Sequence, residues 1–123
     1  MAYAGIQTLL LAYKQRQSDK QFELMQISNE RKAVVAKGKE YTEDYSIAKG
    51  ALNPDDVTYG DDLDDLANAY NMDMKEIALM EDELDDRKSN CETELNYISG
   101  YISSWEAALN QSIAKDHTYG ATQ

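Results

Sequence analysis

Apolar residues recur every seven positions along the second half of the chain. The series starts at Leu63, and all its members are apolar: Leu63, Tyr70, Ile77, Leu84, Cys91, Ile98 and Trp105. The positions four residues after each of these run from Ala67 to Leu109, and only Glu81 and Lys88 among them are charged. A repeat of about 3.5 residues keeps one stripe of a helix facing a partner helix. The pattern therefore predicts a helix over about 62–115, interrupted locally at Gly100 and ending before Gly120.

The first half carries a weaker version of the same pattern. Its series comprises Ile6, Tyr13, Lys20, Ile27, Val34 and Tyr41, and the companion positions comprise Leu10, Gln17, Leu24, Arg31, Gly38 and Tyr45. This stripe is apolar at both ends and polar around Gln17 and Lys20. It predicts a helix over about 4–49 with Gly38 as a weak point, because glycine lowers helix stability.

A turn signal separates the two predicted helices. The chain's single proline lies in Asn53-Pro54-Asp55-Asp56, and a residue before proline is disfavoured from helix. The acidic residues that follow, from Asp61 to Asp65, suit the positive end of a helix dipole. We therefore expect an all-α fold, a long antiparallel two-helix hairpin (coiled coil) with its turn at about 50–61, forming a single domain over 1–123. A short third helix near the turn is the alternative, if Gly38 or Gly50 lets the chain fold again.

Charge favours this pairing and limits the partners. Residues 1–50 hold eight Lys/Arg and six Asp/Glu, whereas residues 51–123 hold four and seventeen. A mildly basic helix beside a strongly acidic one favours antiparallel docking. The net charge of −11 argues against nucleic acid or an anionic membrane as partner, because phosphate binding needs clustered Lys/Arg. No run approaches the roughly 20 apolar residues of a membrane span.

A lone two-helix hairpin buries little apolar surface against the cost of ordering the chain. Tyr3, Tyr97, Tyr101 and Tyr119 fall outside the predicted stripe or at the ends, and large amphipathic rings in such places are typical of interfaces. We therefore expect self-association through the apolar end where the two termini meet. The predicted interface comprises Ile6, Leu10, Tyr13, Tyr97, Ile98, Tyr101, Ile102, Trp105, Leu109 and Ile113.

Candidate chemistry is sparse. Cys91 lies on the apolar stripe and is expected to be a buried thiol. His117 has no catalytic partner that the pattern places near it, so we expect no catalytic residue and no enzyme. The acids from Asp55 to Asp65 do not fit a calcium loop, because the fifth and sixth positions counted from Asn53 are Val57 and Thr58. No cofactor and no specific metal site is expected; loose binding of divalent cations at the acidic turn stays open.

Two resemblances bear on function. A segment of about 25 residues, from Gln7 to Arg31, resembles the start of a group of small uncharacterised bacterial proteins, whose C-terminal halves also look like one long acidic helix. The residues that carry this resemblance are Gln7, Leu10, Arg16, Ser18, Asp19, Phe22, Gln26, Ile27 and Arg31. Tyr13 and Gln15 depart from the Leu and Ala of that pattern. The architecture also resembles needle subunits of type III secretion systems and the helical core of flagellins. Needle subunits have a Pro-x-x-Pro-type turn, whereas this chain has one turn proline and is longer. The Trp-x-Gly turn typical of small leaderless secreted hairpins is absent as well, because Trp105 is followed by Glu106-Ala107.

These observations predict a non-enzymatic structural subunit that self-assembles into a helical filament or tube. No basic residue precedes the apolar run Leu9–Ala12, so a conventional secretory leader is not indicated. The expected location is a bacterial surface or the extracellular space by a leaderless route, and otherwise the cytoplasm. The alternative is a soluble acidic coiled-coil adaptor or chaperone that binds a basic partner protein.

Overall fold

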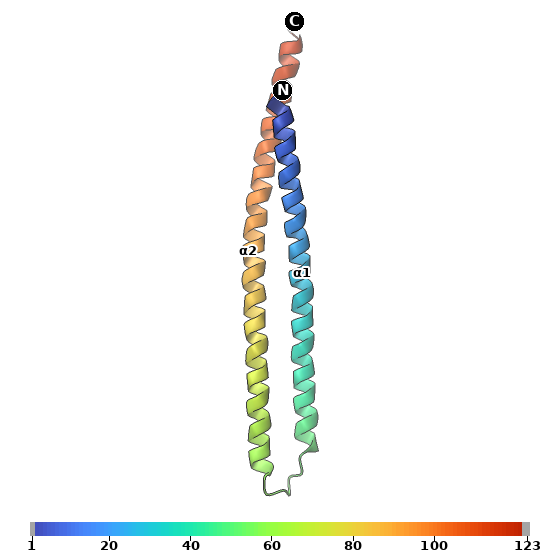
Figure 1. Cartoon of the computed structure of the whole chain (residues 1–123), viewed down its shortest axis with the longest axis vertical. Helices are drawn as coiled ribbons and strands as arrows, with labels where there is room; N and C mark the ends of the chain where they lie inside the picture. The colour runs from blue at the N-terminus through green and yellow to red at the C-terminus, as the bar shows by residue number, and fades with distance from the viewer. Residues whose placement is uncertain (1, 122–123) are drawn as a thin grey trace. The chain divides into compact units, whose positions relative to one another are not determined.

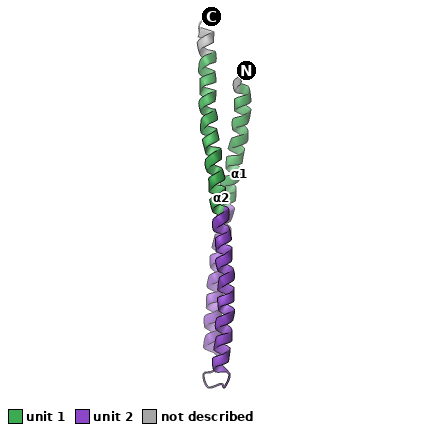
Figure 2. Cartoon of the chain, turned by 90° about the vertical axis from the view of Figure 1, so that its left-hand side faces the viewer, with its two compact units in different colours: residues 1–25, 88–123 green, residues 26–87 purple. Residues whose placement is uncertain are grey.

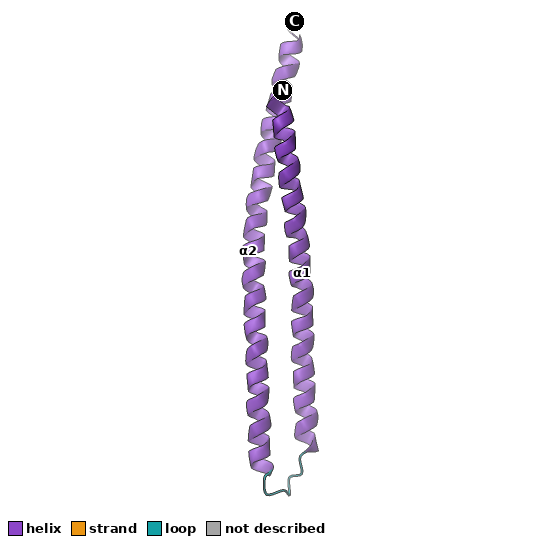
Figure 3. Ribbon diagram, viewed as in Figure 1, coloured by secondary structure: helices purple, strands orange, loops and turns teal. Residues whose placement is uncertain are grey.

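The chain folds into two helices that pack against each other. The computed structural model describes the backbone of residues 2–121 and the side chains of residues 4–116, so the expectations for the side chains of Tyr3, His117 and Tyr119 lie outside the described part. Helix α1 spans Ala2–Ala51 and helix α2 spans Tyr59–Ala121 (Figure 1). The described residues contain no strand (Figure 3). The predicted all-α helical hairpin is therefore confirmed.

The contacts divide the chain into two compact units, each made of a stretch of both helices (Figure 2). Within its described part, unit 1 comprises residues 2–25 and 88–121, and unit 2 comprises residues 26–87. The predicted stripe forms the contact in both units. Every predicted position on α1 is buried or half-buried, and on α2 only Lys88 is exposed. A seven-residue period was thus sufficient to find the faces that pack.

In unit 2 the two helices are held together by apolar contacts, by a pair of stacked tyrosines and by ion pairs. Gly38 is buried opposite Ile77, and a Cβ added at Gly38 would lie 3.5 Å from Ile77 Cγ2. Tyr45 stacks on Tyr70 with ring centroids 4.5 Å apart. Ion pairs join Arg31 to Asp85 and Arg87 to Glu30.

The turn between the helices occupies residues 52–58 and is shorter than predicted. Asn53 directs it: its Oδ1 accepts a hydrogen bond from the Asp55 amide at 3.0 Å, and its carbonyl accepts one from the Asp56 amide at 3.1 Å. The Tyr59 amide then donates to the Asp56 carbonyl at 3.1 Å, and α2 begins. The described residues of this turn include no third helix, so that alternative is wrong.

Both helices extend beyond their predicted ends. Helix α1 continues past residue 49 to Ala51, and α2 begins before residue 62 and passes residue 115 to reach Ala121. The predicted interruption at Gly100 is wrong, as is the expectation that α2 ends before Gly120. One glycine lowers the stability of a helix by only about 1 kcal/mol. The helix continues through Gly100 because Ile98 and Ile102 on either side of it are buried against α1.

Candidate self-association surface

Most of the residues predicted for the interface pack within unit 1 of the chain itself. Leu10, Ile98 and Ile102 form its buried cluster. The half-buried residues packed against that cluster are Ile6, Tyr13, Trp105 and Leu109. These seven residues bring α1 and α2 of one chain together.

The other three predicted residues lie on the surface. The exposed fractions are 66% for Tyr97, 51% for Tyr101 and 46% for Ile113. Tyr101 stacks on Tyr13 of α1, with ring centroids 5.5 Å apart and an angle of 26° between the rings. Tyr97 and Tyr101 are four residues apart on α2, so they share one face of that helix.

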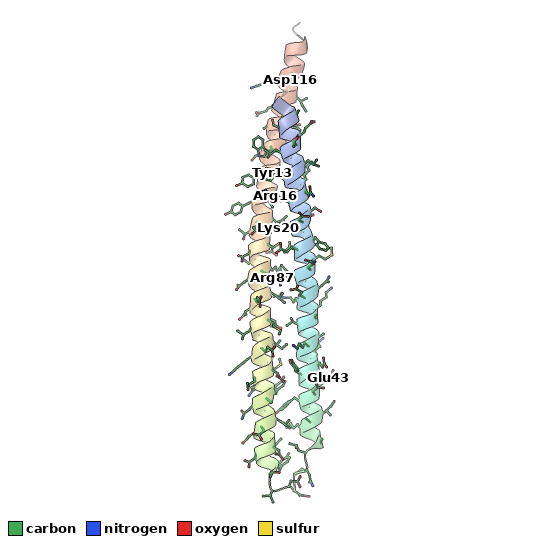
Figure 4. All side chains as sticks on the ribbon, viewed as in Figure 1. Tyr13, Arg16, Lys20, Glu43, Arg87 and Asp116 are labelled. Carbon is green, nitrogen blue, oxygen red and sulfur yellow. The ribbon has the colours of Figure 1, made fainter. Side chains whose placement is uncertain are left out.

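A groove of about 560 Å³ runs beside these tyrosines. Its floor includes Ile98, and its rim includes Arg16, Asp19 and Lys20 from α1 with Glu94, Tyr97 and Tyr101 from α2. The Arg16 guanidinium lies 5.8 Å from the centroid of the Tyr13 ring, within range of a cation–π contact. Tyr13, Arg16 and Lys20 follow one another along α1 (Figure 4). The groove is thus an aromatic surface edged by charges of both signs.

A polar layer interrupts the apolar contact below the cluster. Lys20 forms ion pairs with Glu23 and Glu94, and hydrogen bonds to these two carboxylates raise the pKa of Lys20. From neutral pH upward, its contribution to stability is therefore complete up to the ordinary pKa of lysine and is lost as the pH rises beyond it. Gln17 Nε2 donates to Ser99 Oγ at 3.2 Å, which adds a second polar contact between the helices.

Cys91 lies in the same layer and is buried, as its place on the stripe predicted. Its Sγ lies 3.3 Å from the carbonyl oxygen of Lys20, to which the thiol donates. Burial is the main cause that raises the pKa of this thiol, and the nearby Glu23 adds to the effect. A buried thiol with a raised pKa is held in its unreactive form.

The sequence reasoning missed eight large apolar residues that the structure leaves exposed. Three lie in unit 1, namely Leu11, Phe22 and Met25. Five lie in unit 2, namely Val35, Ile47, Val57, Met72 and Leu79. An apolar residue on the side of a helix opposite its packing stripe is the signal that could have found most of them.

The acidic turn offers no assembled metal site. Among the described residues, no group of three or more His, Cys, Asp or Glu side chains is placed to hold a metal ion. Within the same residues, neither helix has a stretch long and apolar enough to cross a membrane.

Comparison of the chain with protein-family models, with curated proteins and with solved structures gives no match.

Proposed function

We propose that this chain is a non-enzymatic structural subunit that self-associates through its helices into a filament or tube. The observation that carries the proposal is the balance of apolar residues. Seven hydrophobic residues are buried among the described residues, none of the largest side chains is fully buried, and eleven large hydrophobic residues are exposed. A chain that orders this many residues around so thin a core gains stability when copies cover each other's apolar surface.

The aromatic groove of unit 1 is the first surface that such an association would cover. Tyr97 and Tyr101 offer large, rigid contact area at its edge, and aromatic residues are enriched among those that dominate binding energy. Arg16 and Asp19 beside them provide charges that a second copy can pair. The buried residues Leu10 and Ile102 support this surface from within the chain rather than forming it.

Tyr97→Ala tests the proposal without disturbing the core. Tyr97 is 66% exposed, and alanine favours helix, so the hairpin should remain folded. We expect wild-type chain to form larger particles as its concentration rises in sedimentation velocity, with filaments in negative-stain micrographs. Tyr97→Ala should raise the concentration needed by about tenfold or more. Val57→Ala in the turn is the control, and a wild-type chain that stays monomeric at every concentration would contradict the proposal.

One observation favours the alternative of an adaptor that binds a basic protein. On α2 the exposed carboxylates of Asp82, Glu83 and Asp86 have no ion-pair partner among the described residues. A basic partner would find unpaired charge there. An adaptor should stop growing at a dimer or small bundle, whereas a filament subunit should grow without limit, so the same sedimentation series separates the two functions.

Location on a bacterial surface belongs to this proposal as well. It is supported by the resemblance of the N-terminal segment to small bacterial proteins and by the shared strategy of helical-hairpin filament subunits. Immunogold labelling of intact cells tests it, and gold confined to the cytoplasm would contradict it.

A further inference from the structure

Unit 2 presents a basic face on an exposed side of α1. Lys32, Val35, Ala36 and Lys39 share this face, which we call the basic face. Together with Ser28 and Arg31 they line a shallow groove of about 490 Å³. Val35 is 43% exposed at its centre. Neither Lys32 nor Lys39 forms an ion pair with a described residue.

The same unit presents an acidic face on an exposed side of α2. Met72, Glu76, Leu79 and Glu83 follow one another at helical spacing, and we call this set the acidic face. Met72 and Leu79 are 71% and 69% exposed, and both glutamates are exposed. On the basic face Val35 and Ala36 lie between two lysines, and on the acidic face Leu79 lies between two glutamates, so the two faces carry opposite charge.

The contacts within unit 2 show which residues of the two helices lie at the same level. Arg31 is level with Asp85, Gly38 with Ile77, and Tyr45 with Tyr70. Because both helices rise by about 1.5 Å per residue, positions between these pairs can be matched. Lys32 is level with Glu83, Ala36 with Leu79, and Lys39 with Glu76.

Beyond Lys39 the two helices still carry opposite charges at the same level, but here the acids are on α1 and the base is on α2. Glu43, labelled on α1 in Figure 4, lies one turn beyond Lys39 on that helix. Its level on α2 is that of Met72, one turn from Lys75, and Lys75 is level with Glu40. A base on α2 is thus level with acids on α1 at the end of the faces where the order of charges reverses. The complementarity extends along the faces and is not confined to one pair.

We propose that a second copy of this chain docks side by side on the first, in the same direction and without stagger, with its acidic face on the basic face. This arrangement joins Lys32 to Glu83 and Lys39 to Glu76 of the neighbouring copy and covers Leu79 with Val35 and Ala36. The contact uses different surfaces on the two copies, so the docked pair keeps one free face of each kind, and addition can continue without limit. The inference rests on the proposed self-assembly and names its lateral contact.

Charge reversal on either face tests this contact. Lys32→Glu/Lys39→Glu and Glu76→Lys/Glu83→Lys each place like charges opposite one another, and all four positions are exposed, so the hairpin should keep its helical circular dichroism. Each double variant alone should need at least about tenfold more protein to grow in sedimentation velocity. A 1:1 mixture of the two should recover wild-type growth, because their native faces pair and their reversed faces also pair. The control Asp55→Lys/Asp56→Lys has the same net charge as the second variant and should grow at least as well as wild type.

The outcomes separate this contact from self-assembly itself. If wild type stays monomeric at every concentration, both the proposed function and the lateral contact are wrong. If wild type grows and either double variant grows equally well, self-assembly stands and the lateral contact is overturned. If both variants lose growth and their mixture does not recover it, the faces do not pair with each other and the contact is also overturned.

Discussion

At the scale of single residues, Gly38 is the position where a small change should stabilise the protein. It is buried in unit 2, and a Cβ there would meet Ile77 Cγ2 at 3.5 Å and Ile77 Cγ1 and Met74 Cε at 4.0 Å, which are ordinary van der Waals distances. Gly38→Ala should therefore raise the free energy of unfolding by about 0.5–1 kcal/mol, through helix propensity and reduced freedom of the unfolded chain. Urea denaturation followed by circular dichroism measures the change.

Gly100→Ala is the matched control for this substitution. Gly100 has nothing within 4 Å of an added Cβ, so the control isolates the backbone contribution. Gly38→Ala should stabilise the chain at least as much as Gly100→Ala. A loss of stability at Gly38, with a gain at Gly100, would mean that Ile77 needs the space that glycine leaves.

The sequence predicted which residues form the packing stripe of each helix. It did not predict whether a residue of the stripe packs within one chain or between copies. The seven-residue period identified the buried positions of both helices, including Cys91, Ile98 and Ile102. The same period cannot distinguish an apolar residue that faces the chain's own second helix from one that faces another copy, because both contacts repeat every seven residues. Leu10 was therefore expected in an interface between copies, and it lies in the contact within one chain.

At the scale of the helices, the ion pairs between α1 and α2 should contribute little individually. Arg87 and Glu30 in unit 2 have side chains 40% and 50% exposed, so water screens their attraction. A double-mutant cycle of Arg87→Ala and Glu30→Ala should give a coupling of about 0.2–1 kcal/mol that shrinks in high salt. Urea denaturation of the four proteins at two salt concentrations measures it. A larger coupling that salt leaves unchanged would show that this pair is shielded from water.

The helix ends were harder to predict than the helices. The sequence indicated that the acids from Asp61 onward begin the second helix, but α2 begins at Tyr59. Hydrogen bonds set the position where this helix begins, and a sequence repeat does not reveal them. The Asp62 amide donates to the Thr58 carbonyl at 2.8 Å, and Thr58 Oγ1 donates to Asp62 Oδ2 at 3.0 Å. The helix therefore begins two residues before the acids, and its first turn includes Asp61 and Asp62. Local geometry of this kind depends on single side chains rather than on a repeat.

At the scale of the whole molecule, stability should depend on protein concentration. Copies that associate bind the folded chain and not the unfolded one, so mass action raises the midpoint of thermal unfolding. Each tenfold rise in concentration above the association threshold should add about 1.4 kcal/mol, or a few degrees in Tm. Circular dichroism melts over a hundredfold range of concentration measure the shift. The double variant Lys32→Glu/Lys39→Glu should show a smaller shift over the same range, because it loses the lateral contact but keeps the aromatic groove.

The shape of that dependence also separates the two proposed functions. For a subunit that grows without limit, Tm should keep rising together with light scattering as concentration increases. For an adaptor that stops at a dimer, scattering should level off while Tm rises, since no particle larger than the dimer forms. A midpoint that is the same at every concentration would mean that seven buried hydrophobic residues and the contacts around them are enough to hold the hairpin alone. The exposed apolar residues of both units would then have no role in stability, which would contradict self-assembly through them.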